Sequence, residues 1–146
     1  MKKNKKQLIL ILVPLLLVIS ALSGCVGPWA IDTLGWNHAN HEGTAVTIKG
    51  QLTLVENPKN WNLGFAWDTS SHSNWDEYPN RKEADTYHGG GVYTLEITNL
   101  DRTTKYYYRA WGEYTLQQSQ VRQGVERTFV PGGPAVINKP YQIEIG

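Results

Sequence analysis

Hydrophobic and polar positions follow two different patterns along this chain. Residues 8–19 are apolar except for Pro14, and four lysines precede them within the first six residues. A positively charged segment followed by an apolar one is typical of a secretory signal. From Thr44 onward, apolar residues recur at every second position instead, which predicts half-buried β-strands.

The alternation predicts an all-β domain built from short strands. In the first strand, residues 44–54, Gly50 indicates a bulge or a close approach by another side chain. Turn-forming residues separate the segments, and none of them has a helical period, so we expect a sandwich or a barrel. Further strands are predicted near residues 61–67, 92–98, 105–114 and 125–130, with a short edge strand near 83–87 inside the long polar segment 68–91.

One stretch resembles a known family. Residues 100–110 read Leu-Asp-Arg-Thr-Thr-Lys-Tyr-Tyr-Tyr-Arg-Ala, which is similar to the junction between strands E and F of fibronectin type III-like domains. The resemblance implies an immunoglobulin-like sandwich in which Tyr106 is a tyrosine corner, its hydroxyl bonding back to the turn. Residues 65–69 and 128–131 resemble the end of strand C and the closing strand G. The long segment 68–91 and the pair Trp67-Asp68 depart from the family pattern.

The single cysteine of the chain, Cys25, lies directly after the apolar run. Together with Leu22, Ser23 and Gly24 it resembles the lipobox of prokaryotic lipoproteins, in which the cysteine receives a lipid and the chain is cut just before it. The alternative is an uncleaved anchor helix, although residues 8–22 are short for a span that needs about 20 apolar residues. Both interpretations place the lysines inside and the domain on the extracytoplasmic face of the membrane.

These patterns divide the chain into four parts. Residues 1–24 are predicted to be the signal or anchor helix, 25–43 a tether, 44–131 the fibronectin type III-like sandwich and 132–146 a tail. The tether assignment follows from its glycine, proline and asparagine residues and from the lack of a clear period. The alternative is that its apolar side chains pack back onto the domain, namely Trp29, Ile31 and Trp36.

Charge and motif content exclude several functions. Without residues 1–24, ten Lys and Arg stand against thirteen Asp and Glu, a net charge of −3, so we expect no nucleic-acid binding. No nucleophile elbow, phosphate loop or glycine fingerprint occurs, so we expect no catalysis. His38 and His41 are not predicted to lie on a helix, which their three-residue spacing would need to pair them as metal ligands. The acidic residues of the segment 68–91 match no calcium-binding loop. We therefore expect neither a metal nor a cofactor. Those acidic residues are Asp68, Asp76, Glu77, Glu83 and Asp85.

Aromatic residues are the remaining candidates for binding. If Tyr106 and Tyr108 face the core, then Tyr107 and Trp111 lie on the opposite face of the same strand. Trp75, Tyr78 and Tyr87 lie in the polar segment 68–91. Exposed aromatic rings stack on sugars or anchor a protein partner, whereas covered rings are ordinary cross-strand pairs. The sequence therefore predicts a lipid-anchored, non-catalytic binding or spacer module with a protein partner, or alternatively a carbohydrate-binding domain.

Overall fold

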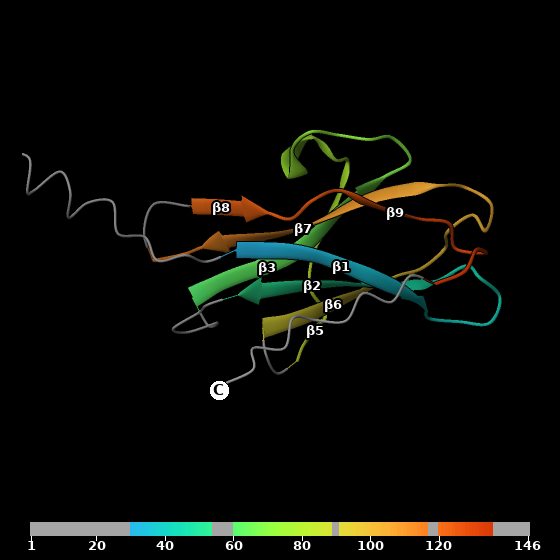
Figure 1. Ribbon diagram of the computed structural model, residues 1–146, viewed down its shortest axis with the longest axis horizontal. Helices are drawn as coiled ribbons and strands as arrows, with labels where there is room; N and C mark the ends of the chain where they lie inside the picture. The colour runs from blue at the N-terminus through green and yellow to red at the C-terminus, as the bar shows by residue number, and fades with distance from the viewer. Residues whose placement is uncertain (1–29, 54–59, 89–90, 117–119, 136–146) are drawn as a thin grey trace, which may run out of the picture.

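The strands of the domain form two antiparallel sheets. The computed structural model describes residues 30–53, 60–88, 91–116 and 120–135, shown in colour in Figure 1. The first sheet has the order β1-β2-β6-β5 and the second β4-β3-β7-β8, with β9 also paired to β7. The strands are Ala30–His38 (β1), Val46–Thr53 (β2), Trp61–Asp68 (β3), Asn80–Glu83 (β4), Thr86–Tyr87 (β5), Val92–Ile97 (β6), Tyr106–Tyr114 (β7), Gln120–Gln123 (β8) and Arg127–Phe129 (β9).

The predicted all-β class is confirmed for the described part of the chain. The described residues contain no α-helix, and a single 3-10 turn, η2, spans Trp75–Glu77. The expected signal or anchor helix over 1–24 lies outside the described residues, as does most of the expected tail, from 136 to 146. No helix among the residues that are described has the length and apolar character needed to cross a bilayer.

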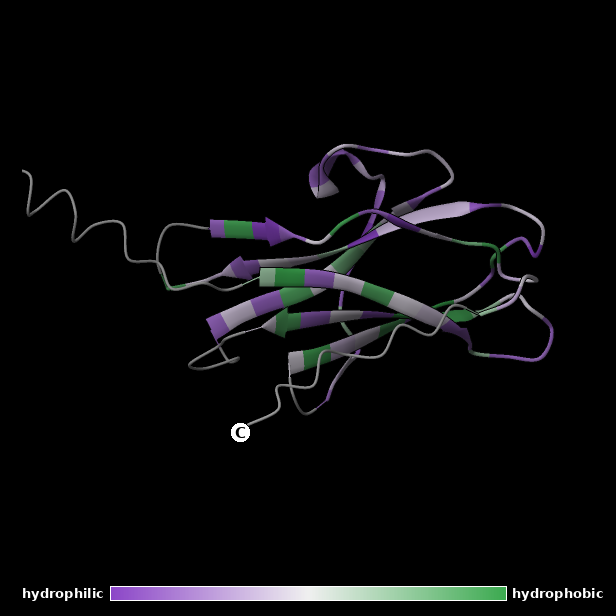
Figure 2. Cartoon of the chain, in the orientation of Figure 1, coloured by the Kyte–Doolittle hydropathy of each residue, from purple (hydrophilic) through white to green (hydrophobic). Residues whose placement is uncertain are grey.

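The two sheets enclose one core, to which both contribute alternate side chains. Val46, Ile48 and Leu52 of β2 belong to the same core cluster as Leu63 and Phe65 of β3, and all five are at least 98 % buried. Figure 2 shows the corresponding alternation of hydrophobic and hydrophilic residues along the strands. Burial of such side chains is the main favourable contribution to folding.

Gly50 marks the predicted close approach within this core. A Cβ atom at Gly50 would lie 2.7 Å from the ring of Tyr93 on the neighbouring strand β6. The Tyr93 ring therefore occupies the space that a side chain at position 50 would need. Its hydroxyl crosses to the other sheet and donates a hydrogen bond to the carbonyl of Trp111 at 3.2 Å. The glycine thus allows a large ring to bridge the two sheets.

Strand β1 corrects the expected tether over 25–43. Residues 30–38 pair with β2, and Ile31 and Trp36 are 5 % and 2 % exposed, so these two side chains do pack onto the domain. A β-bulge between Thr33 and Trp36 changes the register. Because the bulge adds a residue, the inward positions change from odd to even numbers, which hides the period of two in the sequence.

The polar segment 68–91 contains two short edge strands rather than the one expected near 83–87. Strand β4 pairs with β3 in one sheet, and β5 pairs with β6 in the other. The change of sheet occurs between two consecutive residues. The amide of Ala84 donates to Leu63 of β3, and the amide of Asp85 donates to Thr94 of β6, both at 2.9 Å.

The turn between β6 and β7 has the hydrogen bond that was expected of Tyr106. Asn99 has a positive φ of 59°, which asparagine tolerates better than most residues. The amide of Asp101 then donates to the Tyr106 hydroxyl at 3.1 Å. Leu100 is 7 % exposed, and the Tyr106 ring stacks on Phe129 with centroids 5.2 Å apart. The start of β7 is therefore fixed to the turn that precedes it.

Candidate functional site

Four of the five predicted aromatic binding residues gather on the outer face of the second sheet. We call residues 69–79, which follow β3 and include η2, the cap. Trp75 and Tyr78 of the cap pack with Tyr107 and Trp111 of β7 and with Ala66 of β3. In Figure 1 the cap lies beyond β7, on the side away from the first sheet. The fifth residue, Tyr87, lies apart from them on β5 at the edge of the first sheet and is 57 % exposed.

Of the two alternatives left open for the aromatic residues, Tyr78 and Trp111 fit the covered one and offer no open surface to a ligand. Tyr78 is 1 % exposed and Trp111 is 7 % exposed. Trp75 stacks on Trp111 with ring centroids 4.8 Å apart and an interplanar angle of 29°. The alternation along β7 correctly placed Trp111 on the outer face. It contains no information about the cap, which comes from a distant part of the sequence and covers that face.

Gly64 explains why the Trp111 ring packs so closely on the sheet. It lies opposite Trp111 in the pairing of β3 with β7. A Cβ atom at position 64 would lie 2.5 Å from an atom of the indole ring. With no side chain there, the indole packs against the backbone of β3. Trp111 is therefore a packing residue of the covered face.

Trp75 and Tyr107 remain half-buried, and each has a cation beside its ring. The guanidinium carbon of Arg81 lies 5.7 Å from the Trp75 ring centroid, and Lys105 Nζ lies 5.1 Å from that of Tyr107. Cations at this distance are attracted to the negative face of an aromatic ring. The rims of the aromatic cluster thus combine partly accessible rings with positive charge.

Glu126 connects the cap to the sheet beneath it. Its carboxylate accepts hydrogen bonds from Ser71 Oγ at 2.6 Å, from the His72 amide at 3.0 Å and from the Tyr78 hydroxyl. Partial burial alone would raise the pKa of Glu126, but the hydrogen bonds from Ser71, Tyr78 and His72 hold it below its ordinary value. Burial, and then the bond to Glu126, raises the pKa of Tyr78, which keeps its proton for this bond.

Two further side chains of the sheet hold the backbone of the cap. Arg109 donates from Nη2 to the carbonyl of His72 at 3.1 Å and from Nη1 to Gly124 at 2.9 Å. Gln123 accepts from the Trp75 amide at 2.7 Å and donates to Ser73 at 3.2 Å. Sequence reasoning missed Glu126, Arg109 and Gln123, because their partners in the cap lie 37 to 55 residues away and no local pattern reveals them.

The polar side chains of the cap form hydrogen bonds with one another, with the neighbouring Asp68 and with the sheet. His72 Nε2 lies 2.8 Å from the Asp68 carboxylate, and the hydrogen bond to His72 lowers the pKa of Asp68. The Ser71 hydroxyl donates to Glu126 and not to the imidazole.

The histidines and acidic residues that were candidates for metal ligands do not form a cluster in the described part of the chain. Among the described residues, no group of three or more His, Asp or Glu side chains could hold an ion. His38 packs edge-on against Trp36 with centroids 5.2 Å apart. Asp85 pairs with Lys82 at 2.9 Å, and Glu77 accepts hydrogen bonds from Ser73 and Asn74. Asp85 and Glu77 therefore serve separate local contacts.

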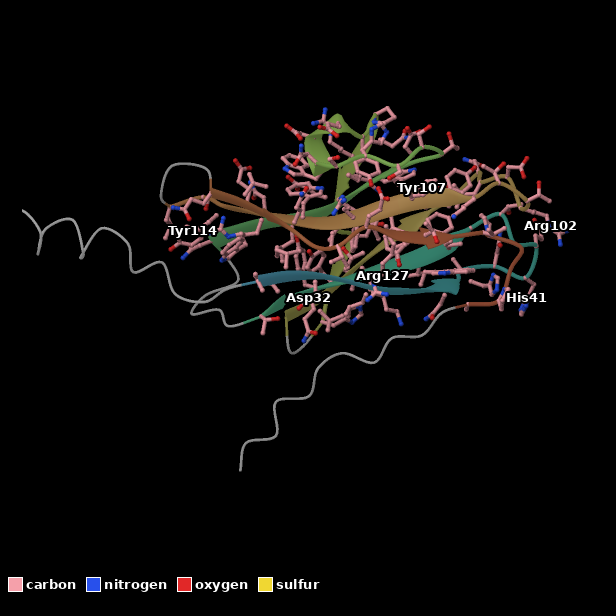
Figure 3. The ribbon with its side chains drawn as sticks, turned by 45° about the horizontal axis from the view of Figure 1, so that its top comes forward. Asp32, His41, Arg102, Tyr107, Tyr114 and Arg127 are labelled. Atoms are coloured by element: carbon pink, nitrogen blue, oxygen red, sulfur yellow. The ribbon has the colours of Figure 1, made fainter. Side chains whose placement is uncertain are left out.

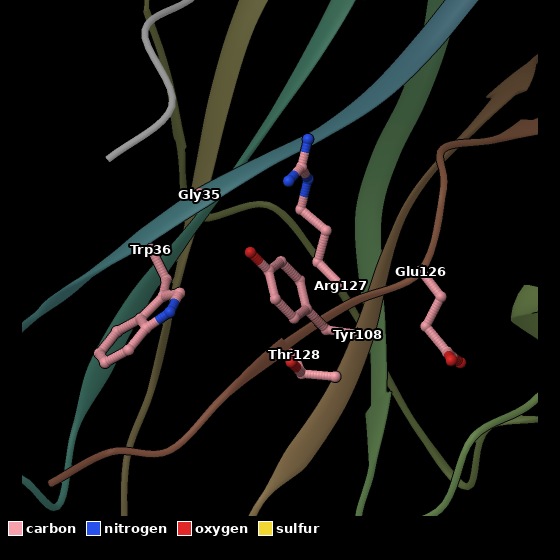
Figure 4. A pocket seen from close by; sticks show the side chains of 6 residues that line it. All are labelled: Gly35, Trp36, Tyr108, Glu126, Arg127 and Thr128. Carbon is pink, nitrogen blue, oxygen red and sulfur yellow. The ribbon is translucent and has the colours of Figure 1, made fainter. Parts of the chain in front are cut away.

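A pocket of about 320 Å³ lies between β1 and β9 (Figure 4). The Tyr108 hydroxyl donates to the carbonyl of Leu34 at 2.6 Å, and Arg127 Nε donates to the carbonyl of Thr33. Burial raises the pKa of Tyr108. These bonds join β1 to the second sheet, so the side chains that line the pocket help to hold the two sheets together. Its lining residues are Gly35, Trp36, Tyr108, Glu126, Arg127 and Thr128.

The predicted lipidation site, Cys25 with Leu22, Ser23 and Gly24, lies outside the described residues. The first described residue after it in the sequence is Ala30, where β1 begins. Comparison of the chain with known protein families, curated proteins and solved structures finds no match.

Proposed function

We propose that this protein is a lipoprotein, held by a lipid on Cys25 at the extracytoplasmic face of the cell membrane, whose domain is a non-catalytic binding or spacer module. The observation that carries the proposal is the N-terminal sequence. Lysines, an apolar run and Leu22-Ser23-Gly24-Cys25 follow one another in the order that lipidation requires. Strand β1 of the domain is described from Ala30, five residues after the cysteine in the sequence.

We further propose that the domain is an immunoglobulin-like sandwich of the fibronectin type III kind. Its four-stranded sheet β1-β2-β6-β5 corresponds to strands A, B, E and D of that fold, and β3, β7 and β8 correspond to strands C, F and G. The hydroxyl of Tyr106, the first residue of β7, bonds to the backbone five residues upstream, which supports a tyrosine corner. Domains of this kind serve many unrelated functions, so the fold alone does not specify a ligand.

The contacts of the cap support a non-catalytic role. Glu126, Arg109 and Gln123 all use their polar groups to hold backbone or side chains of the cap. Groups that are fixed in this way stabilise one conformation of the surface, as a spacer or a preformed binding surface requires.

Carbohydrate binding is the second candidate. It would use the half-buried rings of Trp75 and Tyr107, each with a cation beside it, and the exposed ring of Tyr87. Tyr78 and Trp111 do not contribute to it, because both rings are buried where the cap packs on the second sheet. The candidate therefore depends mainly on Trp75, whose ring is already stacked on Trp111.

Cell fractionation tests the proposed function. The full-length protein, expressed in a bacterium that processes lipoproteins, is compared with Cys25→Ser. We expect the wild type in the membrane fraction, released by detergent but not by high salt, because acyl chains and not charge hold it there. The Cys25→Ser variant should not be lipidated. Metabolic labelling with a fatty acid decides the test, because the retained apolar residues 8–22 can hold the variant in the membrane without a lipid. A wild type that takes up no label, or equal label in both proteins, would reject lipid anchoring through Cys25.

A further inference from the structure

One end of the domain is defined by the entry of the chain. Strand β1 begins there at Ala30, which pairs with Thr53 at the end of β2. Strand β3 begins and β7 ends at the same end, where Trp61 pairs with Tyr114. Figure 1 shows these strand ends together on the side where β8 begins. We call this the entry end.

The chain between the anchor and the entry end is short. Five residue steps separate Cys25 from Ala30. A fully extended chain of that length spans at most about 18 Å. If Cys25 carries a lipid in the bilayer, the entry end cannot move farther from the membrane than this. The tether expected over 25–43 would have allowed several times that distance.

The entry end presents apolar and aromatic side chains. Leu116 is 63 % exposed and lies just beyond β7, after Thr115, whose amide bonds to the carbonyl of Asn60. Tyr114 is half-buried and packs on Trp61 with centroids 5.2 Å apart. Figure 3 places Tyr114 at this end and the exposed His41 and Arg102 at the opposite end. The far end therefore has exposed charged side chains, whereas the described part of the entry end has an exposed leucine beside the polar Thr115.

We propose that the entry end rests on the outer surface of the lipid bilayer, with Leu116 in the acyl-chain boundary and Tyr114 at the level of the headgroups. This inference depends on the proposed lipid anchor and adds an orientation to it. Tyrosine and tryptophan favour the membrane–water interface, and a leucine there buries apolar surface. With β1 nine residues long, the far end then lies about 30 Å from the membrane, because strands rise about 3.3 Å per residue.

Depth-dependent quenching of a fluorescent label tests this orientation. In the full-length lipidated protein Leu116→Cys introduces a thiol that can be labelled selectively, because the lipid blocks Cys25. Val125→Cys is the matched control, since Val125 is 64 % exposed and follows β8 near the middle of the domain. Arg102→Cys marks the far end. Each variant is labelled with an environment-sensitive dye and reconstituted into phosphatidylcholine vesicles that contain nitroxide-labelled lipid.

We expect the label at position 116 to be quenched at least threefold more strongly by the nitroxide lipid than the label at 125, and the label at 102 least. Equal quenching at 116 and 125, with lipid on Cys25 shown by intact mass, would overturn the orientation and leave the lipid anchor standing. If the intact mass shows no lipid and a second dye molecule attaches to Cys25, the proposed anchor is rejected, and the orientation is rejected with it.

Discussion

Glu126 has a central role in the structure of the cap. One carboxylate accepts hydrogen bonds from Ser71, from the His72 backbone and from Tyr78. Hydrogen bonds to a charged group are stronger than those between neutral groups, so this residue contributes more than an ordinary surface glutamate. It lies between β8 and β9, where β7 changes its pairing partner. The interruption of the strand thus places the carboxylate beneath the cap.

The lowered pKa of Glu126 predicts an acid-sensitive stability. The folded state binds the proton less readily than the unfolded chain, so the free energy of unfolding falls as the pH decreases from about 4.5 through the lowered pKa. Replacement of Glu126 by Gln should reduce the stability at pH 7 and make its decline over this range shallower. Urea unfolding at several pH values between 3 and 7 measures both effects.

Glu96→Gln is the control for this measurement, because Glu96 is exposed on β6. It should keep the stability of the wild type at pH 7. A pH profile of Glu126→Gln that is as steep as that of the wild type would contradict the role given to the carboxylate. Some pH dependence should remain, since hydrogen bonds also lower the pKa of Asp68 and Asp101.

At the scale of elements, β1 connects the two sheets along one side of the domain. It pairs with β2 in the first sheet. At the bulge its backbone also accepts hydrogen bonds from Tyr108 and Arg127 of the second sheet. The hydroxyl of Thr33 lies in the interior and accepts a hydrogen bond from the Ala110 amide at 3.0 Å. The strand is therefore part of the core and not a linker.

Replacement of Thr33 by Val tests the place of β1 in the domain. Valine keeps the shape of threonine but leaves the buried amide of Ala110 without an acceptor, which should cost about 1–3 kcal/mol of unfolding free energy. Chemical unfolding monitored by tryptophan fluorescence measures this loss. His41→Ala, an exposed change within the same segment 25–43, should have no effect. If Thr33→Val were as stable as His41→Ala, β1 would not belong to the core, and the expected tether over 25–43 would be favoured.

The alternation of residue types was enough to predict several strands and their inward faces. It predicted the inward side chains of β2 and β7 and the close approach at Gly50, because the period of two survives wherever a strand is regular. It failed for β1, where the bulge breaks that period, and for the 83–87 region, where the chain changes sheets within one residue. A local pattern does not record either event.

The candidate site was predicted less well than the fold. The residues Trp75, Tyr78, Tyr107 and Trp111 were found because aromatic side chains are conspicuous in a polar segment and on an outward strand face. The sequence left open whether these rings are exposed or covered, because that depends on how the cap packs on β3 and β7. The contacts that hold the cap join positions far apart in the sequence, and a single sequence gives no indication of them.

For the whole molecule, the two ends of the domain have different surroundings in the proposed arrangement. The entry end lies at the membrane, and the turns that contain His41 and Arg102 point away from it (Figure 3). A partner in the extracytoplasmic space would reach those turns and the cap first. The aromatic rings buried under the cap would not be part of such a contact, since Tyr78 and Trp111 are covered.

Titration with glycans distinguishes the two candidate functions. Because Trp75 is stacked on Trp111 and its cluster is largely covered, we expect chito-, cello- and manno-oligosaccharides to leave the tryptophan fluorescence unchanged. A saturable fluorescence shift that is lost in Trp75→Ala but kept in Trp75→Phe would contradict this expectation. That result would favour the carbohydrate-binding function, since the phenyl ring preserves an aromatic surface.

The most direct test of the account is the intact mass of the mature protein purified from membranes. We predict a chain that begins at Cys25, lacks residues 1–24 and carries the added mass of a diacylglyceryl group or of that group with a further acyl chain. A Cys25→Ser protein from the same cells should carry no such mass and should keep its first 24 residues. An unmodified wild-type chain that retains residues 1–24 would contradict the lipoprotein proposal, and the N-terminal segment would then be an uncleaved anchor.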